Sequence, residues 1–144
     1  MIGLKVDAAK KGFFDREAVM EAVDRATLRV LSRFGAFVRT RARTSIRRRK
    51  GTSPAGGPPY SHVGLLRNLI FFAFDADRRS VVVGPVLINS PTGAPENLEY
   101  GGQADLPMPK GGSRRVTIAP RPYMGPALDA ELPGLPAMWQ DSVR

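Results

Sequence analysis

The stretch that decides the fold is DREAVMEAVDRATLRVLSRFGAFVRTRARTSI, residues 15–46. Its apolar side chains recur every three or four residues, a spacing that places them along one side of an α-helix. This apolar stripe comprises Val19, Val23, Ala26, Val30, Phe34, Phe37, Val38 and Ala42. Asp15 stands where a helix N-cap belongs, and Glu17 falls in the first turn, where negative charge is favoured. We therefore expect one amphipathic helix of about 48 Å, at about 1.5 Å per residue, whose stripe must be covered by later segments or by another subunit.

Length and composition indicate a single domain over residues 1–144, with a core over about 15–130 and a tail over 131–144. The chain has no cysteine, which excludes a disulfide framework and a thiolate metal site. No apolar run approaches the ~18 residues that a membrane helix needs. Residues 1–11 lack the apolar centre of a signal peptide. We expect a protein that is made and folded in cytoplasm, with no membrane partner.

The net charge of +9 comes almost wholly from one place. We call it the basic patch, and it comprises Arg39, Arg41, Arg43, Arg47, Arg48, Arg49 and Lys50. Without these seven residues, the 22 basic residues fall to 15, against 13 acidic ones. Cations at the end of a helix complement its dipole, so a solvated face is one interpretation. The other is a surface that faces phosphate or an acidic partner. No aromatic residue interrupts the run, so base stacking is not indicated.

Two aromatic and β-branched runs, residues 70–74 and 80–84, are separated by the turn-forming residues 75–79 and predict a β-hairpin. Both runs are apolar on nearly both faces, so we expect one face on the long helix and the other against a neighbour. In this arrangement Val30, Phe34 and Val38 would pack around Phe72 and Val82. Alternation of Ile2, Leu4 and Val6 predicts a further short strand at the N-terminus.

All 13 prolines follow residue 53, and residues 51–60 (GTSPAGGPPY) cannot form regular structure. This proline-rich segment is either a flexible linker or an extended arm, and we expect an arm that lies on an adjacent subunit. Further along the chain we expect a short helical turn over 65–70, turns over 88–95, and a helical turn over 96–100 that ends at Gly101 and Gly102. An exposed loop over 103–113 would lead to a third strand of the sheet over 114–119. The last expected element is a helix over 127–132, broken at Pro133 and Pro136. The predicted class is α+β: one long N-terminal helix packed on a small antiparallel sheet, with long loops and a short broken C-terminal helix.

A search for catalytic chemistry finds little. His62 is the one histidine, and its place in a proline-rich loop favours a polar loop residue over a catalytic base. The carboxylate pairs Asp75 with Asp77 and Glu96 with Glu99 fit a turn and a helix surface. Glycine-rich residues 109–113 match neither phosphate-loop pattern. We therefore expect no catalytic residue, no cofactor, no metal site and no small-molecule substrate, and we predict that the protein is not an enzyme.

Four motifs in order carry a resemblance to a known family: PPYSHVGLLRNLI at 58–70, a hairpin that ends in VVVGP at 81–85, LEYGG at 98–102 and APRPYMGPAL at 119–128. Together they resemble the tailed-bacteriophage minor tail-component proteins that act at the head-tail junction. The similarity covers roughly residues 15–130. The chain departs from that family at Pro133 and Pro136, where the family's last helix is continuous, and in its long loops over 86–97 and 103–113.

The resemblance implies a non-enzymatic structural virion protein that forms a ring, commonly six-fold, as a neck connector or a tail terminator (tail-completion) protein. Such a ring would join the DNA-filled head to the tail. Its partners would be further copies of the chain, other neck and tail proteins, and DNA that passes through without sequence-specific contact. The alternative is a small basic nucleic-acid-binding module that uses the basic patch.

Candidate contact residues between subunits or rings follow from the basic patch, the proline-rich segment and the motifs. They are Arg39, Arg43, Arg47, Arg48, Arg49, Lys50, Pro58, Pro59, Tyr60, Glu99, Tyr100, Tyr123 and Met124. A conduit must release its DNA, and many inward cations would hold it tightly. We therefore expect most of the basic patch to face an acidic surface on a neighbouring ring or subunit, with at most one or two side chains at the lumen.

Overall fold

The computed structural model describes residues 15–86, 94–109 and 111–143, and its dominant element is the long helix α2, Arg16–Ser45. The Asp15 carboxylate accepts a hydrogen bond from the Ala18 N–H at 3.1 Å, so the predicted N-cap is confirmed. Ile46 takes an extended backbone conformation and ends the helix. The strand predicted over residues 2–6 lies outside the described residues, as do most of the turns predicted over 88–95.

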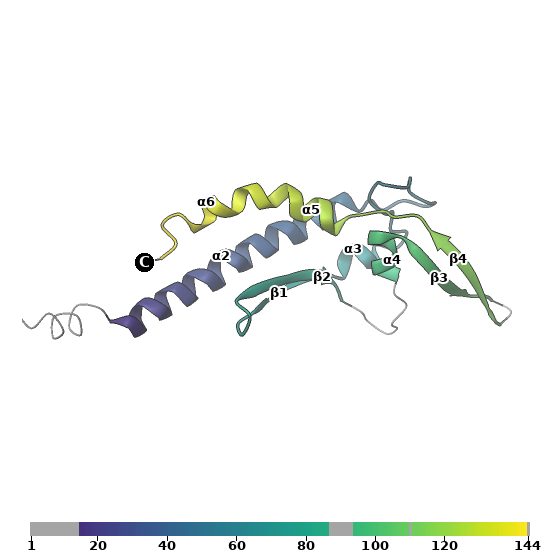
Figure 1. The fold of residues 1–144 in the computed structure, drawn as a ribbon. Helices are drawn as coiled ribbons and strands as arrows, with labels where there is room; N and C mark the ends of the chain where they lie inside the picture. Colours follow the sequence, from purple (N-terminus) through teal and green to yellow (C-terminus); the bar gives the residue numbers. More distant parts are fainter. Residues whose placement is uncertain (1–14, 87–93, 110, 144) are drawn as a thin grey trace, which may run out of the picture.

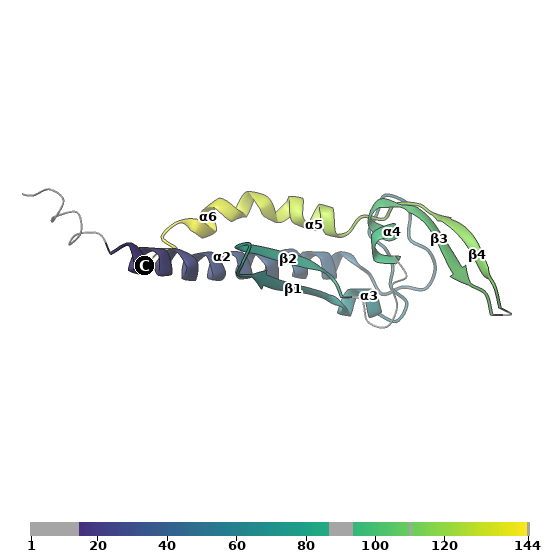
Figure 2. The same cartoon turned by 60° about the horizontal axis from the view of Figure 1, so that its bottom comes forward.

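Two layers cover α2 from different sides (Figure 1). The first is an antiparallel hairpin of β1, Ile70–Asp75, and β2, Ser80–Pro85. The second runs from α5, Met124–Glu131, through the 3-10 turn η1, Leu132–Gly134, to α6, Leu135–Trp139. In Figure 2 the hairpin lies in front of α2 and the C-terminal helices lie above it, and both layers contact α2. The predicted α+β class, with a long helix on a small antiparallel sheet, is confirmed.

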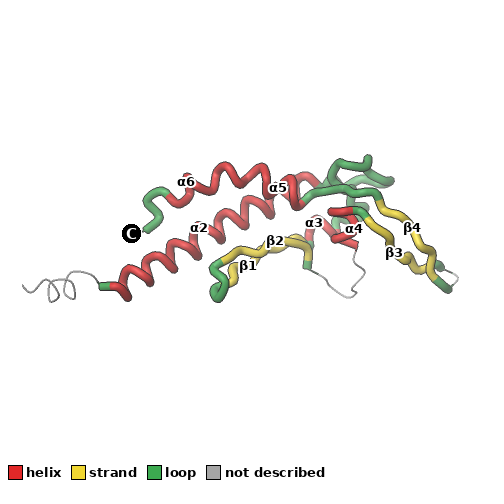
Figure 3. The backbone as a smooth tube through the Cα atoms, in the orientation of Figure 1, coloured by secondary structure: helices red, strands yellow, loops and turns green. Residues whose placement is uncertain are grey.

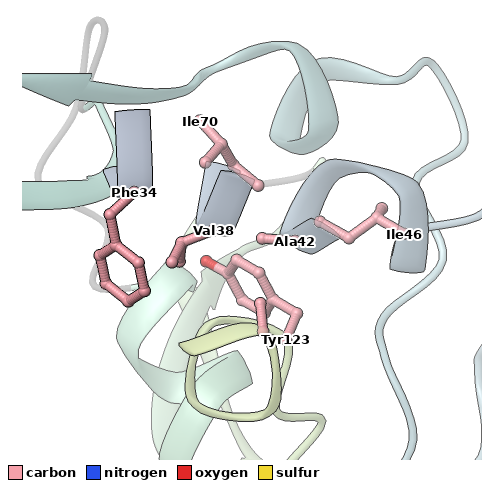
Figure 4. Packing of buried hydrophobic residues seen from close by; sticks show 7 residues of the cluster. Phe34, Val38, Ala42, Ile46, Ile70 and Tyr123 are labelled. Carbon is pink, nitrogen blue, oxygen red and sulfur yellow. The ribbon is translucent and has the colours of Figure 1, made fainter. Parts of the chain in front are cut away.

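The core lies where the C-terminal half of α2 meets both layers (Figure 4). Its buried residues are Phe34, Val38, Ala42, Ile46, Ile70, Tyr123 and Ala127. The predicted stripe is right for Ala26, Val30, Phe34, Val38 and Ala42, which are all buried. It is wrong for three positions, because Val19, Val23 and Phe37 are 43%, 38% and 39% exposed. The first turns of α2 reach beyond the covering layers, and Phe37 lies beside the stripe under the Arg33 guanidinium, 5.5 Å from its ring centroid.

The hairpin sits close to α2 because residue 35 is a glycine. A Cβ atom at Gly35 would lie 2.5 Å from Cγ2 of Val81 and 3.2 Å from Cδ2 of Phe72. The prediction that the stripe packs around Phe72 and Val82 is therefore right for Phe72 and wrong for Val82. Val82 is 62% exposed, and its neighbours on β2, Val81 and Val83, pack against the core instead. A strand alternates its side chains between faces, so one face of β2 excludes Val82.

A second hairpin replaces the exposed loop predicted over 103–113. It consists of β3, Gly102–Pro107, and β4, Ser113–Ile118, and it projects beyond the C-terminal end of α2 (Figures 1 and 3). Strand β4 had been predicted as a third strand of one sheet, but it pairs only with β3 in a separate two-stranded sheet. The sequence pattern for strand β3 is weak. Only Ala104 and Leu106 alternate with polar residues before Pro107, and proline and glycine surround the turn.

The shorter helices follow the predictions more closely. Helix α3, Leu65–Asn68, and helix α4, Ala94–Tyr100, both form, and Gly101 ends α4 with a positive φ of 77°. The predicted break of the C-terminal helix at Pro133 and Pro136 is confirmed. Helix α5 ends at Glu131, the 3-10 turn η1 contains Pro133, and α6 begins at Leu135 with Pro136 in its first turn. The residues that join these segments keep helical backbone angles, so the chain continues in nearly the same direction. No helix in the described part of the chain is long and apolar enough to cross a membrane.

Candidate subunit-contact surface

Glu99, one of the predicted contact residues, is bound within its own chain. Its Oε2 accepts the backbone N–H groups of Tyr123 at 2.9 Å and of Met124 at 3.0 Å, and its Oε1 accepts the N–H of Gly125 at 2.7 Å. The first N–H groups of a helix have no partner within the helix, and no side chain at the start of α5 caps them. A carboxylate at this end also complements the helix dipole. Glu99 is therefore the cap of α5, supplied by α4.

A second set of hydrogen bonds ties the same segments together. The Arg121 N–H donates to the Leu98 carbonyl at 2.6 Å. The Arg121 side chain donates to the carbonyls of Ser53 and Ala119, each at 3.0 Å. The two sequence motifs at 98–102 and 119–128 thus form one unit, together with the start of the proline-rich segment.

The two tyrosines near this unit have opposite environments. Tyr123 is 1% exposed and points into the core (Figure 4). Burial raises the pKa of Tyr123 to about 12, and the nearby Glu99 charge acts in the same direction. Tyr100 is 79% exposed. Met124 is half-buried and packs against the core. Of the four contact candidates in these motifs, only Tyr100 exposes most of its side chain.

The proline-rich segment lies along its own subunit. The Ser61 N–H donates to the Arg47 carbonyl at 3.0 Å, and the Gly56 N–H donates to the Pro120 carbonyl at 2.8 Å. Pro59 is buried and Pro58 is exposed. The Arg49 guanidinium lies 5.6 Å from the ring centroid of half-buried Tyr60. The described hydrogen bonds anchor the segment to the end of α2 and to the chain before α5. Its contact with an adjacent subunit stays a prediction.

Two members of the basic patch join α2 to the two layers that cover it. The Arg39 Nε donates to the Ile70 carbonyl at 2.8 Å, and its guanidinium lies 5.6 Å from the centroid of the Phe71 ring. Arg41 forms an ion pair with Glu131 of α5. Arg39 thus joins α2 to β1, and Arg41 joins α2 to the C-terminal helix.

The other five members form a positive surface at the end of α2. Arg47, Arg48, Arg49 and Lys50 are exposed and Arg43 is half-buried. Within the described ranges, none of these five lies within 4.0 Å of a carboxylate oxygen. We call them the exposed basic surface. Their charges remain available for a partner.

His62 borders this surface and organises the loop. Its Nε2 lies 3.0 Å from the Gly51 nitrogen and 3.2 Å from the Gly51 oxygen, while the His62 carbonyl accepts a bond from Arg48 at 3.4 Å. Gly51 has a φ of 96°, which only glycine adopts readily. The imidazole therefore closes the turn that follows the basic run.

A groove lies between β2 and α5, beside the core residues Phe34 and Val38. Its lining includes Val81, Val83, Met124 and Leu128. In the parts of the chain that the structure describes, no group of three or more His, Asp or Glu side chains is gathered as metal ligands would be. A scan of family models and searches of curated proteins and of solved structures found no match for this chain.

Proposed function

We propose that this chain is a structural virion protein that forms a ring at the head-tail junction of a tailed phage or a related particle. One observation carries the proposal. The motifs at 98–102 and 119–128, which carry the resemblance to head-tail joining proteins, are bound to each other through Glu99 and Arg121. Two motifs that serve one structural role are expected to contact each other. The hydrogen bonds between these two motifs therefore support the resemblance to that family.

The charge distribution supports a joining role within that ring. The exposed basic surface lies at one end of the long axis of α2, and its five side chains have no carboxylate partner among the described residues. Charge-assisted hydrogen bonds to carboxylates of a neighbouring ring would hold the two rings in register. We propose an acidic protein surface, rather than DNA, as the principal partner of this end.

The test begins with the purified full-length chain, whose mass by light scattering and appearance by electron microscopy would reveal a ring. The variant Arg47→Ser/Arg48→Ser/Arg49→Ser then probes the joint. Its matched control is Arg16→Ser/Arg67→Ser/Arg78→Ser, which removes the same charge from exposed positions elsewhere. We expect both variants to fold, and only the first to yield heads and tails that fail to join. Charge changes on the partner ring should partly restore joining.

Two outcomes would contradict this assignment. If the first variant joins normally and only DNA retention or ejection changes, then the basic surface faces the lumen. If the chain stays a monomer and binds duplex DNA with a steep dependence on salt, the protein is the alternative basic nucleic-acid-binding module. Each phosphate neutralised would then contribute about 0.9 to the slope of log affinity against log salt concentration.

A further inference from the structure

The second hairpin has one apolar face and one polar face. Its cross-strand pairs place Ala104, Leu106, Val116 and Ile118 on the same side, which we call the second-hairpin face. The opposite side carries Gln103, Thr117 and the ion pair of Asp105 with Arg115, at 3.0 Å. Leu106 is 49% exposed at the outer part of the apolar side. A lone two-stranded hairpin is marginally stable in water. Ala104, Val116 and Ile118 are half-buried, so within the described residues the uncovered part of this face is its outer end, at Leu106.

The first hairpin has an uncovered apolar face as well. Its pairs Phe71 with Gly84 and Ala73 with Val82 point away from α2, and we call these four residues the first-hairpin face. Phe71 is 46% exposed and Val82 is 62% exposed. The other side of this sheet is the one that packs on the core through Phe72, Val81 and Val83. The sheet is therefore apolar on both sides. The core covers one side, and within the described residues the other side carries the Arg39 guanidinium over Phe71 and leaves Val82 largely exposed.

We propose that the second-hairpin face of one copy of this chain packs on the first-hairpin face of the next copy. Each chain has both faces once, and the two hairpins lie well apart along the molecule in both views (Figures 1 and 2). The two faces of one chain therefore cannot contact each other, and the proposed contact joins two copies. Small residues oppose large ones in each: Ala73 and Gly84 leave room beside Phe71 and Val82, while Ala104 leaves room beside Leu106. Two sheets pack face to face by this kind of interdigitation.

Charge sets the direction of the contact. The second-hairpin face has one charged neighbour on its side, Arg114, which pairs with Leu106 at the outer end. The first-hairpin face has Asp75 at its turn end. The Asp75 Oδ1 accepts the N–H groups of Asp77 and Arg78, and its Oδ2 lies 3.9 Å from the Nε of Arg78, which is exposed. Arg39 lies near Phe71 at the other end of this face. Placing Arg114 beside Asp75 brings opposite charges together and keeps Arg114 away from Arg39. If one hairpin were turned end for end, Arg114 of one copy would lie beside Arg39 of the other.

Such a contact uses a different surface on each partner, so an open assembly retains one free face of each kind, at its two ends, until it closes. Contacts of this type generate rings when the rotation closes and filaments when it does not. The inference rests on the proposed function only in requiring that copies assemble side by side. It adds the elements that meet in the subunit contact, and it uses none of the residues of the exposed basic surface.

The absence of cysteine from the chain makes a crosslinking test direct. Ala73→Cys and Ala104→Cys each place a thiol on one face, and both replace a small side chain that is not buried. We expect the two single variants, mixed and mildly oxidised, to give a disulfide-linked dimer that neither gives alone. The double variant should give a ladder of multimers that a reductant collapses. Thiols at Ala73 and Thr117 form the matched control, because Thr117 points to the polar side of the second hairpin.

A dimer from Ala73→Cys alone would overturn the proposal, because it would mean that first-hairpin faces pack on each other. No crosslink in any pair at concentrations where the chain assembles would also overturn it, and would assign these faces to a different protein. A non-covalent check uses Leu106→Asp against Thr117→Asp. Only the former should abolish assembly, and circular dichroism should show that both remain folded. Crosslinking uses the purified chain, so a ladder without head-tail joining would refute the proposed function alone, and joining without a ladder would refute this contact alone.

Discussion

The Glu99 carboxylate accepts the backbone N–H of Met124 at 3.0 Å, although the two residues are 25 positions apart in the chain. This bond and its two companions at Tyr123 and Gly125 connect α4 to the first turn of α5. Tyr123, which precedes α5, and Ala127 within it belong to the core against α2. One carboxylate from a seven-residue helix therefore holds the start of the C-terminal layer.

Removal of the Glu99 carboxylate should lower the stability of the protein. We expect Glu99→Ala to lower the free energy of unfolding by about 1 to 3 kcal/mol, because three N–H donors near the core lose their acceptor. Glu99→Gln should lose less, since its amide oxygen still accepts. Exposed Glu96 on the same helix is the control, and Glu96→Ala should change stability by about 0.5 kcal/mol or less. Urea unfolding of the three variants measures the difference, and equal losses at both positions would disprove the capping role.

Gly35 should tolerate no side chain, although alanine is the better helix former. A Cβ atom there would meet Val81 at 2.5 Å, and overpacking of this kind costs about 1 to 3 kcal/mol, against a gain of about 1 kcal/mol in helix propensity. We expect Gly35→Ala to destabilise the protein in thermal unfolding. In the Val81→Ala background the same change should cost less, because the clashing methyl group is gone. Stabilisation by Gly35→Ala alone would show that the hairpin lies further from α2.

Two phenylalanines three positions apart on α2 should differ sharply. Phe34 is 5% exposed, so Phe34→Ala should cost about 3 to 5 kcal/mol, as expected for a filled core position. Phe37 is 39% exposed, and Phe37→Ala should cost much less. Chemical denaturation of the isolated subunit is the measurement. A loss below about 1 kcal/mol for Phe34→Ala would mean that Phe34 does not lie in the core.

Stability should fall in alkali through Tyr123. Burial, aided by the Glu99 charge, raises the pKa of Tyr123 to about 12, compared with 10.0 for a free tyrosine. As the pH rises from 10 to 12, the unfolded chain loses the phenolic proton before the folded chain does, so the stabilisation that is complete below pH 10 is progressively lost. Tyr123→Phe should flatten this part of the curve of unfolding free energy against pH. An unchanged slope in Tyr123→Phe would assign the alkaline loss to other groups.

The proline-rich segment should be protected before any assembly takes place. The Gly56 and Ser61 N–H groups donate to Pro120 and Arg47 of the same chain, so their hydrogen exchange should be slow in the isolated subunit. Assembly should change that protection little. Fast exchange in the dissociated subunit and slow exchange in the particle would instead support the contact with a neighbouring subunit that the composition predicts.

Much of the fold could be read from local patterns. The 3.6-residue periodicity and the cap at Asp15 predicted α2 to within one residue at each end, and the β-branched runs predicted the first hairpin with its turn. These signals are local, because a helix or a hairpin repeats its burial pattern over a few neighbouring residues. The sequence also located the positive charge at the end of α2.

The tertiary structure alone decided which candidate residues are buried and which are exposed. Glu99 and Tyr123 serve the interior, while the second hairpin, predicted mostly as a loop, has an apolar side on which Leu106 is 49% exposed. No local pattern distinguishes a surface carboxylate from one that caps a helix 25 residues later, because the requirement arises from unpaired N–H groups at the other segment. Periodicity determines which side of an element is apolar, and only packing in three dimensions determines whether the same chain or another one covers it.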